Sequence, residues 1–141
     1  MEITTKSAQE TQELGRTLGS SLKGGEILGL VGDLGSGKTT FVQGLAEGLG
    51  IKERLISPTF ILLREYKRPS GGNFYHVDLY RLEMVTETEL ESLGILDFAK
   101  NKKNIILIEW AEKARKILPA STFWINFEQV DDNTRKILFP Q

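Results

Sequence analysis

A glycine-rich stretch at residues 32–39 carries the residues whose types and spacing most clearly allow chemistry. Its sequence, G-D-L-G-S-G-K-T, fits the pattern G-x-x-x-x-G-K-[ST]. Glycines let the backbone curl so that successive N–H groups point inward, and the N-terminus of a following helix adds partial positive charge. The pattern predicts a phosphate-binding loop in which Lys38 contacts the β- and γ-phosphates and the Thr39 hydroxyl ligates Mg²⁺. The residues expected around the nucleotide are Asp33, Leu34, Gly35, Ser36, Gly37, Lys38, Thr39 and Thr40.

The segments on either side of this loop predict a strand before it and a helix after it, which is the setting of a phosphate-binding loop. The apolar run at residues 26–31 predicts a buried strand, and residues 40–49 place apolar side chains at helical spacing. Gly50 then stands where a helix C-terminal glycine is expected. The alternative, a chance glycine turn before a helix, is disfavoured by this order of strand, loop and helix.

A carboxylate that orders Mg²⁺ is the second requirement of a phosphate-loop hydrolase. Residues 105–108 are Ile-Ile-Leu-Ile and are followed by Glu109. A buried strand that ends in an acid places it at the sheet edge where the loops gather. Glu109 is therefore the first candidate for this catalytic and metal-binding role; the alternative is a surface acid that begins the next helix.

The stretch at residues 76–81, H-V-D-L-Y-R, supplies the second candidate. At the strand period of two, His76, Asp78 and Tyr80 share one face. Such a face at a strand end could order Mg²⁺ or water, with Asp78 as its carboxylate. The alternative is the exposed face of a half-buried strand. His76 by itself indicates little, because a single imidazole in a strand is more often a hydrogen-bonded structural residue.

Length and composition narrow the class of protein. The 141 residues suit one domain, residues 1–141, and the formal net charge of −1 provides no overall basic field for gripping a nucleic acid. The chain has no cysteine, which excludes a disulfide framework and a thiol nucleophile. Neither a membrane-spanning apolar run nor an export signal is evident. We therefore expect a soluble cytoplasmic enzyme.

The remaining segments predict an α/β fold of the phosphate-loop NTPase type, a sandwich with a mixed central β-sheet flanked by helices. A short strand is expected at residues 2–6, and capping-box spacing at Ser7 starts a helix at about Ala8. Residues 61–66 and 73–79 predict an antiparallel hairpin, and Thr86 or Thr88 can cap a short acidic helix. A short basic helix at residues 111–118 and two closing strands at 122–127 and 134–139 complete the chain.

Four motifs together resemble one family. They are G-D-L-G-S-G-K-T-T-F at 32–41, S-P-T-F at 57–60, H-V-D-L-Y-R-L at 76–82 and I-E-W at 108–110. In this order, over about residues 7–127, they resemble the bacterial tRNA threonylcarbamoyladenosine biosynthesis proteins of the TsaE family. The phosphate loop alone is shared by many families, whereas its combination with H-x-D-x-Y-R and E-W is specific.

The resemblance implies a small ATPase, with ATP and Mg²⁺ as cofactors, that assists transfer of a threonylcarbamoyl group to the adenosine beside the anticodon of ANN-decoding tRNAs. The implied partners are the transferase subunit TsaD and its companion TsaB, with tRNA an indirect partner and no membrane involved. Carried over by matching motif, Thr39 ligates Mg²⁺, and Glu109 acts in the Mg²⁺ and water network with support from Asp78. Thr59 belongs to a switch region, and Trp110 lies near the nucleotide.

Other functions remain open from the residues themselves. A GTPase would normally carry Asn-Lys-x-Asp after a strand, and the nearest stretch, N-K-K-N at 101–104, ends in Asn and precedes its strand. A small-molecule kinase usually has an Arg-rich lid, and no insertion of that size is evident. A nucleotide-gated binding module is not excluded. Residues 52–68, with five basic and two acidic residues, are either a solvated face or a contact surface.

Overall fold

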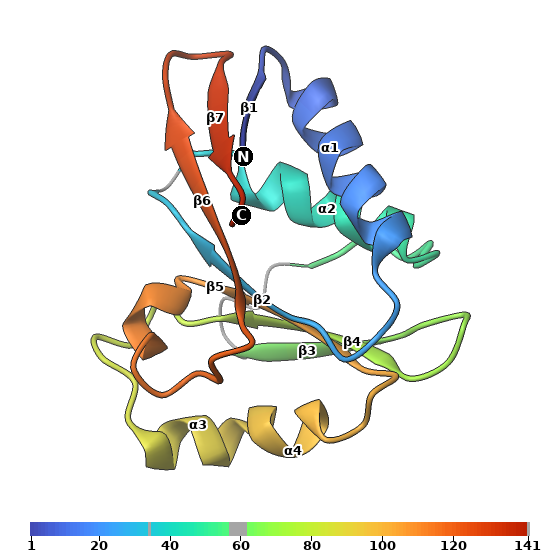
Figure 1. Ribbon diagram of the computed structural model, residues 1–141, viewed down its shortest axis with the longest axis vertical. Coiled ribbons are helices and arrows are strands. Elements are labelled where there is room, and N and C mark those ends of the chain that lie inside the picture. The colour runs from blue at the N-terminus through green and yellow to red at the C-terminus, as the bar shows by residue number, and fades with distance from the viewer. Residues whose placement is uncertain (34, 57–61, 141) are drawn as a thin grey trace.

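One mixed β-sheet organises the chain, with helices on both of its faces (Figure 1). The computed structural model describes residues 1–33, 35–56 and 62–140. The strands are β1 (Glu2–Thr5), β2 (Ile27–Val31), β3 (Leu63–Lys67), β4 (Asn73–Asp78), β5 (Ile105–Glu109), β6 (Phe123–Gln129) and β7 (Arg135–Leu138). The helices are α1 (Ala8–Ser21), α2 (Lys38–Gly48), α3 (Glu87–Leu93), α4 (Ile95–Ala99) and the 3-10 helix η1 (Ala111–Ala114).

The seven strands lie in the order β1-β7-β6-β2-β5-β4-β3. β2 pairs in parallel with β5 and with β6, and β5 pairs in parallel with β4. The outer strands β3, β7 and β1 pair antiparallel with their neighbours. The predicted α/β fold with a mixed sheet is thus confirmed, because parallel strands joined through helices form the centre and hairpin strands are added at the edges.

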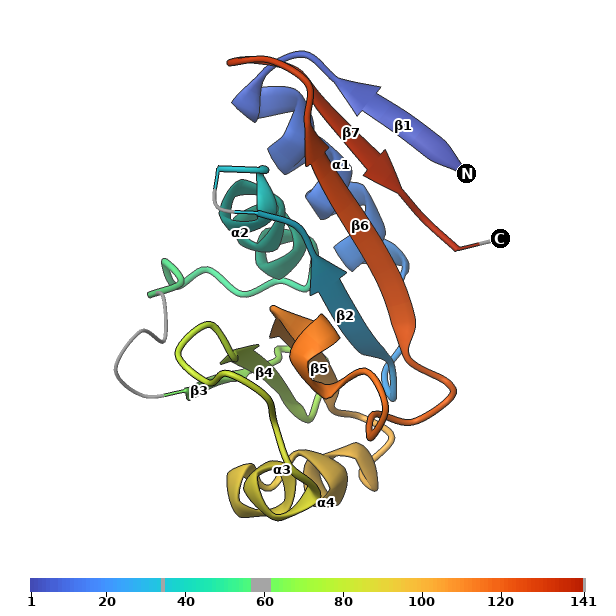
Figure 2. The ribbon, with the colours of Figure 1, turned by 90° about the vertical axis from the view of Figure 1, so that its left-hand side faces the viewer.

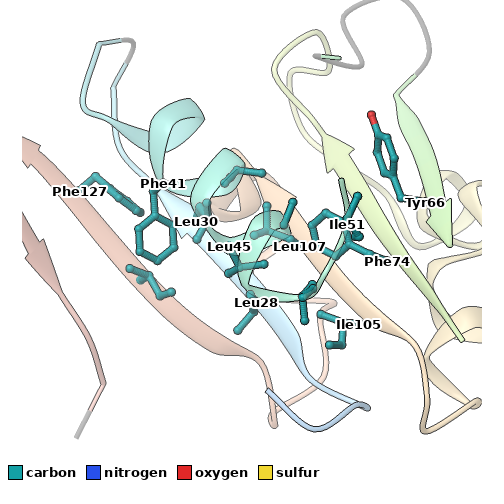
Figure 3. Close-up of a cluster of buried hydrophobic side chains, with 14 of the residues drawn as sticks. Leu28, Leu30, Phe41, Leu45, Ile51, Tyr66, Phe74, Ile105, Leu107 and Phe127 are labelled. Atoms are coloured by element: carbon teal, nitrogen blue, oxygen red, sulfur yellow. The ribbon is translucent and has the colours of Figure 1, made fainter. Parts of the chain in front are cut away.

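Side chains alternate between two cores, one on each face of the sheet. Leu28, Leu30 and Leu107 point to the face covered by α1 and α2, where Phe41 and Leu45 of α2 pack on them (Figure 3). The opposite face is covered by α3, α4 and η1, as Figure 2 shows from the side. Its core contains Tyr75, Val77, Ile106, Ile108, Leu90 and Ile95. Burial on both faces explains why the central strands read as continuous apolar runs.

Helices α1 and α2 approach each other at backbone distance because both carry glycines at the contact. A Cβ added at Gly15 or Gly19 would overlap the backbone of α2, at the carbonyls of Phe41 and Leu45. A Cβ at Gly44 would in turn overlap the carbonyl of Gln12. The short spacing lets both helices lie flat on the same face of the sheet, which holds the start of α2 firmly against the end of β2.

Most expected elements are present at nearly the expected residues. Ser7 caps α1 by accepting the Glu10 N–H at 3.1 Å, and Thr86 begins α3 with a complete capping box. The predicted hairpin forms from β3 and β4, which pair antiparallel. No helix in the described ranges is long and apolar enough to cross a bilayer.

The prediction of a helix at residues 111–118 was wrong in type and length. The regular part is the 3-10 helix η1, which ends at Ala114. Ala111 and Ala114 lie three residues apart, and both are buried against the second core. A 3-10 turn places residues at i and i+3 on the same side, so two small side chains at that spacing allow a tight turn to sit close to the sheet.

Candidate active site

The glycine-rich loop joins the end of β2 to the start of α2, as its sequence predicts. Gly37 has φ of 98° and is the N-cap of α2, so that Lys38 is the first helical residue. The Ser36 N–H donates to the Asp33 carbonyl at 3.1 Å and closes a turn before the helix. At Gly32 a Cβ would lie 2.8 Å from the Phe127 carbonyl oxygen of β6, so this position accepts only glycine without movement.

A cavity of about 430 Å³ opens beside this loop, at the carboxyl ends of β4 and β5. It brings together residues from the loop, from both strand ends and from β7. The lining residues are Gly35, Ser36, Gly37, Lys38, Thr39, Thr40, Asp78, Tyr80, Glu109, Trp110 and Arg135. Ligands of open α/β sheets bind at this edge, beyond the carboxyl ends of the parallel strands.

Lys38 lies in the wall of the cavity and is only 5% exposed. Its Nζ donates to the Gly32 carbonyl and lies 3.9 Å from the centroid of the Trp110 ring. Burial lowers the pKa of Lys38, and the negative charges led by Glu109 oppose that shift. The cation is therefore held by a carbonyl and an aromatic ring and forms no direct ion pair with a described carboxylate.

Glu109 ends β5 and forms a buried pair with His76 of β4. The distance between His76 Nε2 and Glu109 Oε2 is 2.6 Å, and the two residues are 4% and 6% exposed. Both side chains point to the α2 face, because they alternate with Val77 and Ile108 of the opposite core. The predicted polar strand end and the predicted acidic strand end thus meet on one face beside Lys38.

Asp78 stands directly opposite Glu109 in the pairing of β4 with β5. Its Oδ1 accepts the Tyr80 N–H at 2.9 Å, and the side chain is half-buried. Burial raises the pKa of Asp78, and the nearby charge of Glu109 adds to that effect. The cavity wall therefore holds two adjacent carboxylates and one lysine, which is the composition expected where Mg²⁺ and phosphates bind.

Trp110 follows Glu109 with a φ of 57°. In the described part of the chain it is the only residue other than glycine in the left-handed region. Its ring packs against the Tyr80 ring with centroids 5.2 Å apart. The Lys113 ammonium donates to the Tyr80 carbonyl at 2.7 Å and ties the two segments together. These contacts hold the indole beside the Lys38 ammonium in the cavity wall.

A smaller cavity of about 100 Å³ adjoins the first one and shares Gly37, Thr40 and Arg135 with it. Its other lining residues come from the start of α1 and from the turn between β6 and β7: Ser7, Ala8, Thr11, Asp132 and Asn133. The Arg135 Nη1 donates to the carbonyls of Asp131 and Thr134 at 2.8 and 3.1 Å. The guanidinium is thereby held between the two cavities.

The residues predicted from sequence fall into three groups. The loop residues from Gly35 to Thr40 line the first cavity together with Asp78, Glu109 and Trp110. Asp33 is exposed and does not line it, since its carbonyl serves the turn before α2. Leu34 and Thr59 lie outside the described residues.

Three residues near the centre were not among the predicted site residues. Tyr80 belongs to the polar stretch already singled out, and it lines the cavity from the turn after β4. His76 was interpreted as structural, and its contact with Glu109 spans 33 positions of sequence. Arg135 carries no local motif, and only the pairing of β7 with β6 brings it to the loop.

The residues present fit a nucleotide with Mg²⁺. Ser36 Oγ is buried and has no hydrogen-bond partner among the described residues, which suits a donor reserved for a ligand. The described residues contain no cluster of three or more histidine or acidic side chains that could hold a metal alone. Mg²⁺ is usually bound through one or two carboxylates together with substrate phosphates, so this composition agrees with its chemistry.

A family model and individual relatives of this chain agree on one protein family. A family model described as "Threonylcarbamoyl adenosine biosynthesis protein TsaE" matches residues 5–137. The tRNA threonylcarbamoyladenosine biosynthesis protein TsaE of Bacillus subtilis is 38% identical over 135 residues, covering 96% of this chain and 82% of the relative. The protein of the same name from Treponema pallidum is 36% identical over 137 residues, covering 97% and 98%.

A solved structure resembles the whole fold. The crystal structure of Bacillus subtilis YdiB superimposes with a TM-score of 0.80 at 31% sequence identity. The match covers 99% of this chain and 83% of the other. The arrangement of strands and helices described above is therefore shared with an experimentally determined protein.

Proposed function

Because the chain belongs to the TsaE family, whose members take part in threonylcarbamoyladenosine biosynthesis in tRNA, we propose that it is a slow, Mg²⁺-dependent ATPase of that pathway. The observation that carries this proposal is the cavity that joins the glycine-rich loop to the two strand-end carboxylates, Asp78 and Glu109. A phosphate site and an acidic site in one cavity are what nucleotide hydrolysis requires.

The loop would bind the phosphate chain of ATP. The backbone N–H groups of Gly35 and Gly37 and the N-terminus of α2 would provide donors and partial positive charge. The Lys38 ammonium exchanges its contacts with the Gly32 carbonyl and the Trp110 ring for phosphate oxygens. The smaller cavity shares Gly37 and Thr40 with the first one and so adjoins the same start of α2.

Thr39, Asp78 and Glu109 are the residues that would hold Mg²⁺ and its water ligands. When bound, the cation neutralises charge that develops on the phosphates during hydrolysis. Glu109 contributes a fixed carboxylate that orients the attacking water, and Asp78 stands beside it in the strand register. Trp110 and Tyr80 pack against each other and would present aromatic surface to the bound nucleotide.

Slow turnover is expected from the arginine content of the cavity wall, as far as the chain is described. Arg135 is the only arginine among the described lining residues, and its Nη1 is engaged by carbonyls of its own turn. An arginine that reaches the transferred phosphate accelerates hydrolysis in other phosphate-loop enzymes by about 10³–10⁵-fold. A chain without one depends on a partner or on conformational change.

The nucleotide would control docking onto a larger enzyme. We propose that the ATP-bound form docks on the TsaD–TsaB transferase, and that hydrolysis resets the complex between turnovers. The family membership supports this role, and the formal net charge of −1 favours an indirect contact with tRNA over a direct one.

The test is ATP turnover with Mg²⁺, for this chain alone and with the TsaD–TsaB pair added. We expect the chain by itself to hydrolyse ATP slowly and to do so faster when the TsaD–TsaB pair is added. Lys38→Ala should abolish both the basal and the stimulated hydrolysis. Lys116→Ala serves as a lysine control, because Lys116 is exposed and does not line the cavity. Rapid turnover without partners, or indifference to the pair, would contradict the partner-coupled mechanism and favour an independent ATPase or kinase.

A further inference from the structure

The buried pair of His76 and Glu109 supports an inference about how the catalytic carboxylate is held. Among the described residues, the His76 ring is the only side chain that hydrogen-bonds to Glu109, with Nε2 and Oε2 2.6 Å apart. His76 itself does not line the cavity. The hydrogen bond to Glu109 links the His76 side chain to the cavity wall.

A buried carboxylate without a hydrogen-bond partner would not keep this position. Glu109 is 6% exposed, and the His76 ring supplies the protein hydrogen bond that a largely buried carboxylate needs. Lys38 lines the same cavity and is the other charged group with which Glu109 could pair. A direct pair between these two groups would use the lysine that phosphates need and the carboxylate that orders water.

The other nitrogen of the His76 ring indicates which atom carries the proton. Nδ1 is buried and has no hydrogen-bond partner among the described residues. A carboxylate can only accept, so the 2.6 Å contact needs the proton on Nε2, and in the neutral ring Nδ1 then carries none. The Nε2–H group consequently donates to Glu109 Oε2.

We propose that His76 is a positioning residue that holds the Glu109 carboxylate toward the cavity and away from Lys38. This inference rests on the proposed function, since it assigns His76 a part in the same hydrolysis. Outer-shell groups of this kind orient the residues that touch metal or substrate, and their loss typically costs about 10–100-fold in affinity or activity. The expected loss is in kcat, because the phosphate-binding groups remain in place.

The test compares His76→Leu with His76→Gln. His76→Leu should lower kcat about 10–100-fold and leave the KM for ATP within about threefold. His76→Gln keeps an N–H donor within reach of Glu109 and should restore most of kcat. In a Glu109→Ala background, His76→Leu should have no further effect on kcat, because the coupled partner is already gone.

Equal kcat in His76→Leu and the wild type would overturn the proposal. So would a parallel fall of kcat and melting temperature that His76→Gln does not rescue, since that pattern describes a structural residue. An additive loss of kcat in the double variant would also contradict it.

Nuclear magnetic resonance supplies a readout that needs no turnover. His76 is the only histidine of the chain, so its ring signals are unambiguous. We expect a slowly exchanging Nε2–H resonance in the wild type that is lost in Glu109→Ala. A proton on Nδ1, or a ring unaffected by Glu109→Ala, would overturn the assignment. Failure to bind or hydrolyse ATP with an intact Nε2–H resonance would instead overturn the proposed function.

Discussion

Ile108 and Glu109 are neighbours in β5, yet they belong to two regions with different tasks. Ile108 is fully buried in the core under α3, α4 and η1, and Glu109 faces the cavity beside α2. β4 shows the same division, with Val77 in the second core and His76 and Asp78 toward the loop. One face of these strands is apolar along its length, and the other changes from apolar to ionisable toward its carboxyl end.

The difference between the two faces shows how a small sheet can place ionisable side chains and core side chains on the same strands. Because strand side chains alternate with a period of two, adjacent residues can serve opposite faces without interfering. The apolar face supplies burial, and the other face accommodates the costly buried charges Lys38 and Glu109. Substitutions on the two faces should therefore have separable effects.

The largest effect is expected on the ionisable face. Glu109→Gln should reduce ATP hydrolysis about 10²–10⁴-fold, because the amide cannot act as a carboxylate toward water and Mg²⁺. Binding of ATP should change only a few-fold, as measured by titration calorimetry. Glu128→Gln, on an exposed position of β6, is the matched control and should leave both quantities unchanged. Equal loss of binding and hydrolysis in Glu109→Gln would remove the role assigned to Glu109.

The neighbouring substitution Ile108→Ala should affect stability instead. Truncation of a fully buried isoleucine lowers the free energy of unfolding by about 2–5 kcal/mol. Urea denaturation measures this loss, and kcat per folded molecule should stay within a few-fold of the wild type. Val130→Ala, at a residue that is 57% exposed, should cost less than about 0.5 kcal/mol. A large fall of kcat in Ile108→Ala with normal stability would show that the two faces are not separable.

Glycines in the left-handed region provide a third comparison. Gly37→Ala imposes a side chain at a φ of 98° and should cost about 1–2 kcal/mol, while also weakening ATP binding through the distorted loop. Gly94→Ala, between α3 and α4 at a φ of 80°, should cost a similar amount without changing ATP affinity. Titration calorimetry and denaturation distinguish the two outcomes. Unaltered ATP affinity in Gly37→Ala would contradict a phosphate site at the loop.

The smallest effect concerns Asp78 and pH. Burial raises the pKa of Asp78 in the folded protein, so the ionised carboxylate opposes folding above that pKa and the penalty disappears as pH falls through it. Asp78→Asn should stabilise the nucleotide-free protein at neutral pH by less than about 1 kcal/mol, because the group is partly solvated. The difference in stability between wild type and Asp78→Asn should vanish toward about pH 3, where the Asp78 carboxyl is protonated and both side chains are uncharged.

Denaturation of wild type and Asp78→Asn across this pH range measures the effect. Asp97→Asn, at an exposed helix position, is the control and should show no such pH-dependent gain. If the free energies of unfolding of wild type and Asp78→Asn change in parallel with pH, burial of the Asp78 carboxylate does not destabilise the protein.

Local features of the site could be predicted because their determinants are local. The spacing of Gly32, Gly37 and Lys38 defines a loop between a strand and a helix, and both flanking elements form where expected. The period of two places His76 and Asp78 on one side of a strand, and the apolar run before Glu109 places that acid at a strand end. Each inference spans fewer than about ten residues, over which propensity and periodicity act directly.

Long-range features could not be predicted in the same way. The sequence contains no signal that β6 lies parallel to β2, and that pairing places Phe127 against Gly32 and carries β7 with Arg135 to the loop. The 3-10 form of η1 depends on the space left between Ala111 and the sheet. Packing decides both, because several strand orders satisfy the same hydrophobic pattern.

The sequence by itself determined the glycine-rich loop, its strand and helix, and the two acidic strand ends, since local spacing controls backbone conformation. Only the tertiary structure decided that His76 meets Glu109, that Trp110 lies against Lys38, and that Arg135 lines two adjoining cavities. These contacts join residues from distant segments of the chain, and their geometry follows from strand order and close packing of the whole sheet.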